Sequence, residues 1–216
     1  MTKLKLALAV VAAATVFPVQ AALIVFTGAD NNVSSLAQMT NSVAAAAAFN
    51  AAAPGTSIIN FESPLPAGVS ISGGSITNNS GCGALCGFNT TSGGASFLNL
   101  FGGSATITFT SPVNAFGFYI TGLQTNLVPQ ETLTFSDGST QVINTPTATG
   151  GGGAFIGFTD FGRTIVSVTY NATNDIVSID DIRYGFLTVN GVPEPGSLAL
   201  IALAALAMGA ARRRRH

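Results

Sequence analysis

The stretch "ETLTFSDGSTQVIN", residues 131–144, decides the class of fold in this 216-residue chain. Apolar and polar residues alternate on both sides of Asp137-Gly138, as they do in half-buried β-strands. Asp-Gly between two such runs is typical of a type I′ turn, because both central residues of that turn need positive φ angles. The stretch therefore predicts a β-hairpin with its turn at Asp137-Gly138.

Similar runs recur through the middle of the chain. Each either alternates apolar and polar residues or is rich in β-branched and aromatic ones, and turn-forming residues separate them. The nine predicted strands are 57–62, 69–77, 104–110, 114–121, 131–136, 139–144, 154–159, 164–170 and 176–189. Short strands in this number predict an all-β protein, an antiparallel β-sandwich or barrel.

One segment departs from the β pattern. Between Ser34 and Ala53 the chain is rich in alanine, and an apolar or small residue recurs at helical spacing. The positions concerned are Leu36, Met39, Val43, Ala47 and Asn50. We expect a helix over 34–53 that packs on the sandwich and is capped by Asn32 or Ser34.

The first 21 residues have the layout of a secretory signal peptide. Lys3 and Lys5 precede an apolar run at 6–16, and Val19-Gln20-Ala21 fits the small-x-small pattern that signal peptidase cleaves. We therefore expect export, with signal peptidase as a processing partner and a mature domain over 22–191.

The last 25 residues read "VPEPGSLALIALAALAMGAARRRRH". Two prolines keep the Pro193-Glu194-Pro195 step extended. The apolar run that follows, about 196–211, predicts a short transmembrane helix of roughly 24 Å, and the arginines 212–215 would hold its end on the cytoplasmic side. An ordinary C-terminal anchor is the alternative.

These three parts, in this order, resemble the PEP-CTERM sorting signal of exported Gram-negative proteins, here at 192–216. The resemblance implies recognition by an exosortase, removal of the tag near the Pro-Glu-Pro motif, a transient tether in the inner membrane, and a mature protein at the cell surface or outside the cell, in association with exopolysaccharide. The residues of the sorting signal are Pro193, Glu194, Pro195, Arg212, Arg213, Arg214 and Arg215.

The predicted mature domain is acidic. Arg163 and Arg183 are its two basic residues against eight acidic ones, which gives a net charge of −6. Such a domain repels phosphate backbones, so we expect no nucleic-acid partner.

The order of the strand segments also resembles a family of folds. "INFE", "ITFTSPVNAFGFYI", "LTFSDGST", "FIGFT" and "SIDDIRYG" follow one another as in lectin-like or carbohydrate-binding-module-like jelly rolls. The resemblance implies a jelly-roll-like sandwich with a polysaccharide-binding role, and a structural calcium ion between a first-strand acid and a last-strand aspartate. Carried onto this chain, the ligands are Glu62 and Asp180, with Asp181 as a further candidate.

The pair Asp180-Asp181 interrupts the alternation of its strand, because Ile179 and Ile182 flank it. This predicts a bulge that turns one carboxylate inward, where it needs a partner. Two partners are open: Arg183 in a salt bridge, or the calcium ion.

Cys82 and Cys86 are the only cysteines and lie in a glycine-rich stretch. In an oxidising compartment they are expected to form a disulfide that closes a small surface loop.

The chain offers little for catalysis. His216, its one histidine, lies in the tail that sorting removes, so neither a Ser-His-Asp site nor a histidine zinc site can form in the mature domain. We expect a binding protein and no enzyme. The polar stretches 78–80 and 89–91 are candidates for hydrogen bonds to sugar hydroxyls. The alternatives are a structural matrix protein without a ligand and a carboxylate-based glycoside-active enzyme.

Overall fold

A computed structural model describes residues 23–124 and 130–188 of the chain. The predicted signal peptide at 1–21, the predicted transmembrane helix at 196–211 and all seven residues of the sorting signal lie outside these residues. Within the described part, no helix has the length and apolar character needed to cross a membrane.

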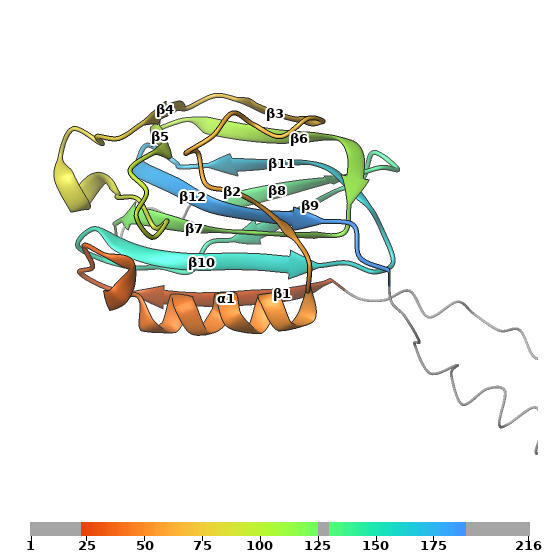
Figure 1. The fold of residues 1–216 in the computed structure, drawn as a ribbon, viewed down its shortest axis with the longest axis horizontal. Coiled ribbons are helices and arrows are strands. Elements are labelled where there is room, and N and C mark those ends of the chain that lie inside the picture. Colours follow the sequence, from red (N-terminus) through yellow and green to blue (C-terminus); the bar gives the residue numbers. More distant parts are fainter. Residues whose placement is uncertain (1–22, 125–129, 189–216) are drawn as a thin grey trace, which may run out of the picture. The chain divides into compact units, whose positions relative to one another are not determined.

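The described residues form two antiparallel β-sheets packed face to face (Figure 1). The larger sheet has the order β1 (Ile24–Asp30), β10 (Gly152–Thr159), β7 (Ala115–Leu123), β12 (Ile176–Gly185), β5 (Phe97–Phe101) and β4 (Ser75–Thr77), with β2 (Ser57–Ile59) also paired to β12. The smaller sheet has the order β3 (Val69–Ser72), β6 (Ser104–Val113), β11 (Ile165–Asn171), β8 (Gln130–Phe135) and β9 (Thr140–Asn144). The predicted all-β sandwich is confirmed.

The main core lies between the two sheets and follows from the alternation along each strand. Val177 and Ile179 on β12 point inward and are fully buried, as are Ile107 on β6 and Phe118 on β7. Phe118 meets Tyr170 of the opposite sheet edge-on, with ring centroids 5.6 Å apart. Each such fully buried side chain contributes about 1.5–3 kcal/mol to folding.

A second, smaller core lies on the outer face of the larger sheet, beneath the helix α1 (Thr40–Ala52) (Figure 1). Phe49 of α1 packs on Phe155 of β10 with ring centroids 5.7 Å apart. The backbones come close together here because β1 and β10 carry glycines: a Cβ on Gly28 would overlap the Asn41 carbonyl, and one on Gly157 would lie 2.8 Å from the Phe49 ring. The predicted helix on the sandwich is therefore confirmed.

Two details of the helix differ from the prediction. The segment begins with a separate 3-10 turn, η1 (Leu36–Gln38), before α1 starts at Thr40. The buried face is formed by Met39, Ser42, Ala46, Phe49 and Ala53. Of the predicted face, Met39 is buried, but Val43 is 41% exposed and Ala47 and Asn50 are exposed too. Alanines on every side of the helix leave its sequence with almost no contrast between faces.

The predicted cap was also wrong. Neither Asn32 nor Ser34 caps α1; instead the Asp30 carboxylate, at the end of β1, accepts the Asn41 N–H at 3.0 Å and the Ser42 N–H at 2.9 Å. Burial raises the pKa of Asp30, but hydrogen bonds from Ser42 and Asn41 outweigh it and hold the pKa below the ordinary value. A carboxylate at a helix N-terminus is also favoured by the helix dipole.

The hairpin at 131–144 is confirmed as β8 and β9, but its turn is of another type. Gly138 has a φ of +82°, whereas Asp137 is not among the residues with positive φ, so a type I′ turn is ruled out. The Gly138 N–H donates to the Phe135 carbonyl at 3.0 Å and the Phe135 N–H to the Ser139 carbonyl at 2.9 Å. This is a three-residue loop with a glycine bulge.

Other strand boundaries differ for local reasons. The predicted strand 69–77 is two strands, β3 and β4, in opposite sheets, because Gly73 and Gly74 adopt φ angles of +81° and +70° and turn the chain. The strand predicted at 57–62 ends at Ile59, and the one predicted at 176–189 ends at Gly185. Strands β1 and β5 were not predicted.

Candidate functional site

Two segments of the chain cover the outer face of the larger sheet. Helix α1 covers β1, β10 and part of β7, and the loop 78–96 lies over β12 and β5. The Cys86 carbonyl accepts hydrogen bonds from Asn99 of β5 at 3.4 Å and from Ser178 of β12 at 3.3 Å. The loop contains the short 3-10 turn η2 (Gly83–Cys86), which the Cys82–Cys86 disulfide closes, so the predicted disulfide is confirmed.

A groove of about 730 Å³ lies between these two covers, at the left end of the sandwich in Figure 1. One wall comes from η1 and the start of α1, and the other from the loop 88–94. The lining residues are Ser34, Ser35, Leu36, Ala37, Thr40, Val43, Phe88, Asn89, Thr90, Thr91, Ser92 and Gly94. A smaller hollow of about 310 Å³ adjoins it, shares Ser34, Phe88 and Asn89, and brings in Asn78, Asn79 and Ser80.

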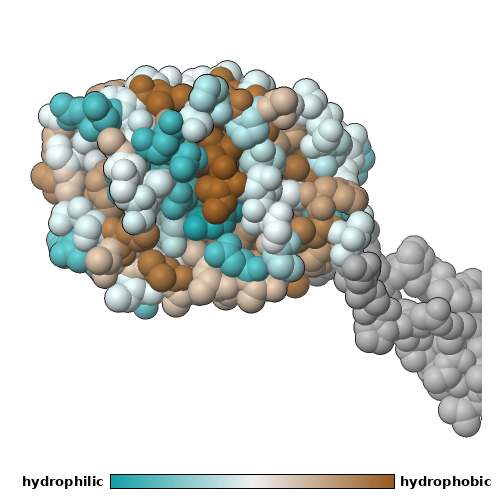
Figure 2. All heavy atoms as spheres, in the orientation of Figure 1, coloured by the Kyte–Doolittle hydropathy of each residue, from teal (hydrophilic) through white to brown (hydrophobic). Residues whose placement is uncertain are grey.

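The chemistry of this groove is uncharged and amphipathic. Its lining among the described residues combines apolar side chains, notably the partly buried Phe88 ring and the exposed Val43, with hydroxyl and amide groups, and includes no acidic or basic residue. Figure 2 shows the same mixture over one whole face of the sandwich, which is pale with brown apolar patches between teal polar ones. A groove of this kind suits a ligand with both CH faces and hydroxyl groups.

Phe88 is fixed from beneath by the central strand β7. The Phe88 N–H donates to Thr121 Oγ1 at 2.8 Å, and the same hydroxyl donates back to the Phe88 carbonyl at 3.0 Å. Since Thr121 is 1% exposed, this pair of bonds is shielded from water and holds the backbone of Phe88 over the sheet.

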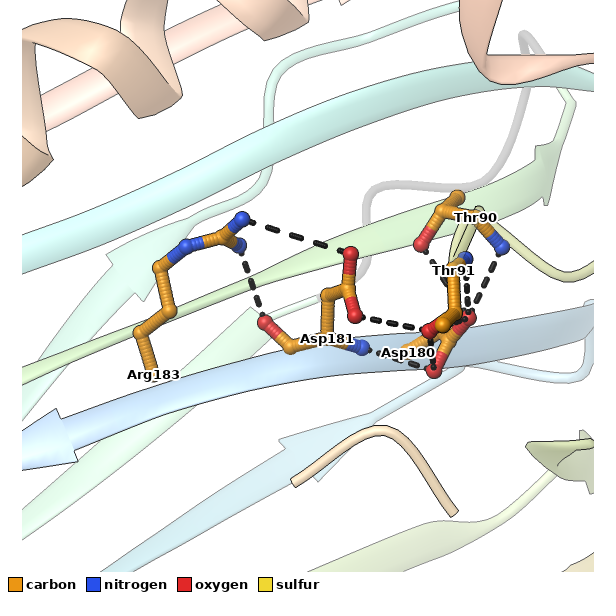
Figure 3. A network of polar contacts seen from close by, with 5 residues as sticks. All are labelled: Thr90, Thr91, Asp180, Asp181 and Arg183. Atoms are coloured by element: carbon orange, nitrogen blue, oxygen red, sulfur yellow. Dashed lines mark hydrogen bonds and ion pairs between the residues drawn. The ribbon is translucent and has the colours of Figure 1, made fainter. Parts of the chain in front are cut away.

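The next part of the loop is held by Asp180, as Figure 3 shows. Asp180 Oδ2 accepts the Thr90 N–H at 2.7 Å and the Thr91 N–H at 3.1 Å. The Asp181 N–H donates to the other oxygen, Oδ1, at 2.7 Å. Asp180 is 1% exposed, and this burial raises its pKa to about 6, although the backbone N–H donors lower it.

The bulge predicted at Asp180-Asp181 is confirmed. The register between β12 and β7 shifts between Asp180 and Arg183, and Asp181 has a φ of +48°. A left-handed conformation at a non-glycine residue costs about 1–3 kcal/mol and needs support from its surroundings. Here it lets two consecutive carboxylates face the same loop, because Thr91 Oγ1 donates to Asp181 Oδ1 at 2.7 Å.

Arg183 lies next to Asp181 and not next to Asp180 (Figure 3). Its Nη1 donates to the Asp181 carbonyl at 3.0 Å, and its Nη2 lies 4.0 Å from Asp181 Oδ2. The guanidinium also lies over the Tyr119 ring, 5.2 Å from its centroid. Arg183 was one of the two partners predicted for the inward carboxylate, which is that of Asp180. Arg183 instead contacts the neighbouring Asp181, and backbone N–H groups bind the Asp180 carboxylate.

Glu62 reaches the far end of the same loop. Its Oε1 accepts the Ala95 N–H at 2.7 Å and the Ser96 N–H at 2.6 Å. The preceding residue, Phe61, has a φ of +59° and a buried ring, so the chain turns sharply after β2 and directs Glu62 toward the loop. Glu62 itself is exposed.

The arrangement does not fit the calcium ion that the jelly-roll resemblance implies. Calcium takes six to eight oxygen ligands, but one oxygen of Glu62 and one of Asp180 already accept two N–H groups each, whose positive hydrogens would face the ion. Glu62 and Asp180 hold different ends of a loop. In the described part of the chain, no three His, Cys, Asp or Glu side chains gather where they could hold a metal.

Sequence reasoning found half of this groove. Of the polar stretches predicted to meet sugar hydroxyls, 89–91 lines the groove and 78–80 lines the smaller hollow beside it. The opposite wall, from Ser34 to Val43, was missed, because the sequence showed only that a helix packs somewhere on the sandwich. Phe88 was also missed; its position between a disulfide loop and a polar run was the one available signal.

The chain has likenesses to known proteins at two levels. Residues 191–215 match the PEP-CTERM protein-sorting motif. No curated protein matches the chain. Among solved structures, it is similar to a family 29 carbohydrate-binding module, CBM29-2 (14% identity, 64% of this chain and 97% of that one, TM-score 0.39).

Two further similar structures are TmCBM61 in complex with β-1,4-galactotriose (16% identity, 59% of this chain and 94% of that one, TM-score 0.39) and the CBM22-1 xylan-binding domain from Paenibacillus barcinonensis (13% identity, 62% and 97%, TM-score 0.39). At these TM-scores the likeness says nothing about which residues of this chain bind a ligand.

The match to the sorting motif is more informative than the structural likenesses. The chain bears a PEP-CTERM signal, which marks an exported protein that is anchored in the membrane and then processed, and it implies an exosortase as the processing enzyme.

Proposed function

We propose that this protein is a polysaccharide-binding protein of the cell surface or extracellular matrix, and that its ligand lies in the groove between α1 and the loop 88–94. The observation that carries the proposal is the composition of the groove: both walls present apolar side chains, Phe88 on the loop and Leu36 and Val43 on the other wall, together with hydroxyl and amide groups. Sugars offer apolar CH faces and hydroxyl edges, and this combination matches both.

The geometry supports binding without catalysis. Glycoside hydrolysis uses two carboxyl groups that flank the scissile bond. The described lining of the groove contains none, and Asp180, beneath it, has both oxygens engaged by the backbone. We therefore expect no release of reducing ends from any polysaccharide that the protein binds.

The structural-matrix alternative differs in one measurable respect, since it predicts no soluble ligand. Both hypotheses share the same expected sorting: export, anchoring, exosortase processing and retention with exopolysaccharide.

The test is binding of the full chain, in mild detergent, to exopolysaccharide from its own host and to a panel of soluble polysaccharides by affinity electrophoresis and calorimetry. The variant F88A should weaken binding about tenfold or more, because it removes the aromatic ring that lines the groove. Val142 is a matched control: it is 54% exposed on β9 of the other sheet, and V142A should bind normally. If F88A and V142A bind equally well, the groove is not the site; if the wild type binds nothing, the matrix alternative stands.

A further inference from the structure

The loop that forms one wall of the groove is fixed at both ends by carboxylates. Asp180 accepts the N–H groups of Thr90 and Thr91, and Glu62 accepts those of Ala95 and Ser96. These four donors belong to successive backbone positions at the two ends of one short segment, 90–96. We call Glu62, Asp180 and this segment the carboxylate clamp.

We propose that the carboxylate clamp does the work that the jelly-roll resemblance assigns to calcium, so that the groove is preformed without a metal and Glu62 and Asp180 are its positioning residues. The inference rests on the proposed function for what the groove binds, but the state of the loop can be measured without any ligand.

The hydrogen-bond geometry is the first support. Backbone N–H groups directed at a carboxylate are charge-assisted donors, stronger than bonds between neutral groups. The bonds of the clamp are short, from 2.6 Å between the Ser96 nitrogen and Glu62 Oε1 to 3.1 Å between the Thr91 nitrogen and Asp180 Oδ2. An ion placed at either oxygen would have to displace two of these donors.

The backbone next to each carboxylate is the second support. Phe61 precedes Glu62 and Asp181 follows Asp180, and both are non-glycine residues with positive φ. Strained conformations of this kind persist where the surroundings fix them, and they are frequent at functional sites. Each directs its neighbouring carboxylate toward the same loop.

Close packing at Gly94 is the third. A Cβ at this position would lie 2.7 Å from Glu62 Oε1 and 3.0 Å from the side chain of Thr91. Because Gly94 and Thr91 both line the groove, the contact with Glu62 transmits the position of the carboxylate directly to the groove wall.

Paired variants separate an N–H acceptor from a calcium ligand. E62Q keeps an oxygen that can accept the Ala95 and Ser96 N–H groups but loses the charge that calcium needs, whereas E62A loses both. We expect hydrogen exchange at the Ala95 and Ser96 amides of the full chain to rise on the order of tenfold in E62A and to rise clearly less in E62Q, which loses the charge assistance but keeps an acceptor oxygen. The Gly138 amide, bonded to Phe135 in a distant turn, is the internal control.

Calcium itself is the second arm. The melting temperature and the exchange pattern should be the same in EDTA and in millimolar calcium chloride. A stabilisation by calcium that E62Q abolishes, or equal loosening of the loop in E62Q and E62A, would overturn the clamp. Polysaccharide binding is then measured on the same variants: if E62A loosens the loop while no polysaccharide binds the wild type, the clamp stands and the proposed function fails.

Discussion

Glu131 shows how a single residue in this fold can set its response to pH. It points from β8 into the core between the sheets, is 0% exposed, and neither of its carboxyl oxygens has a hydrogen-bond partner. Burial raises the pKa of Glu131 well above its ordinary value. The group is therefore held in its neutral form inside the protein.

The sign of the resulting pH dependence follows from linkage. The folded state keeps a proton on Glu131 that the unfolded chain releases near pH 4.3, so the free energy of unfolding falls as the pH rises above that value. Asp180, with its pKa raised to about 6, acts in the same direction between about pH 4 and pH 6. We expect the domain to be more stable near pH 5 than near pH 8.

The variant E131Q tests the assignment to Glu131. Glutamine has the same shape and does not titrate, so E131Q should raise the free energy of unfolding at pH 8 by roughly 1.4 kcal/mol for each unit by which the pKa of Glu131 is raised and flatten its dependence on pH. Urea unfolding at several pH values measures both. D137N, at an exposed turn, should keep the wild-type decrease above pH 5; an unchanged decrease in E131Q would show that another group causes it.

At the scale of elements, α1 depends on a strand for its N-terminus. The helix begins after Met39 without a side-chain cap of its own, and the Asp30 carboxylate on β1 takes that role through Asn41 and Ser42. Helix, strand and groove wall are thus joined at one point, because η1 lies on the connection between β1 and α1.

D30A should lower the free energy of unfolding by about 1–2 kcal/mol, the usual cost of losing an N-cap. Since the pKa of Asp30 is lowered in the folded state, its contribution is present above the unfolded pKa of about 3.9 and is lost as the pH falls below that value. Thermal unfolding at pH 7 and pH 3 tests this, with N50A on the exposed face of α1 as a neutral control. A D30A deficit that is equally large at pH 3 would contradict it.

The elements show why the sequence predicts some features and not others. The hairpin at 131–144 and the strands of 104–121 carry their signal locally, in alternation and turn residues. Strand β5, "FLNLF", is short and almost wholly apolar, so alternation does not reveal it. The alanine-rich α1 has no distinct apolar stripe, and what selects its buried face is the glycine-lined surface of β1 and β10, of which β10 lies about 100 residues further along the chain.

The same reasoning applies to the candidate site. The bulge at Asp180-Asp181 could be predicted, because a broken alternation is a local signal. Its partners could not: Thr90 lies 90 residues from Asp180, and Ser96 lies 34 residues from Glu62. Backbone N–H groups leave no mark in a sequence, so the acids were assigned to calcium by resemblance.

At the scale of the whole molecule, the register of the larger sheet separates two ends. Ile24, Thr159, Ala115 and Gly185 are successive partners across β1, β10, β7 and β12, so the chain enters and leaves the described part at one end. Asp30, Gly153, Thr121 and Ser178 are the corresponding partners at the other end, about 20 Å away along the strands. The groove lies at this second end, since η1 follows β1 and Phe88 is bonded to Thr121.

The sorting motif begins at residue 191, three residues after the last described one. The groove lies at the end of the larger sheet opposite to Gly185, the last residue of β12. This makes binding insensitive to bulk added at the chain-exit end. The turn at 136–138 lies at that end as well. The Ser136 N–H donates to the carbonyl of Thr164, just before β11. The first residue of β11, Ile165, pairs with Val113 at the end of β6, and β7 begins two residues later at Ala115, at the exit end.

A folded tag inserted at either end of the sandwich tests whether polysaccharide binding depends on the groove end alone. A folded tag with flexible linkers between Asp137 and Gly138 should leave polysaccharide affinity within about twofold of wild type, since exposed turn tips tolerate insertions. The same tag between Ser92 and Gly93 lies in the groove wall and should abolish binding. Affinity electrophoresis compares the two, with melting temperatures to show that both chains fold. Equal loss of binding from both insertions would mean that the ligand contacts the exit end and that the groove is not the binding site.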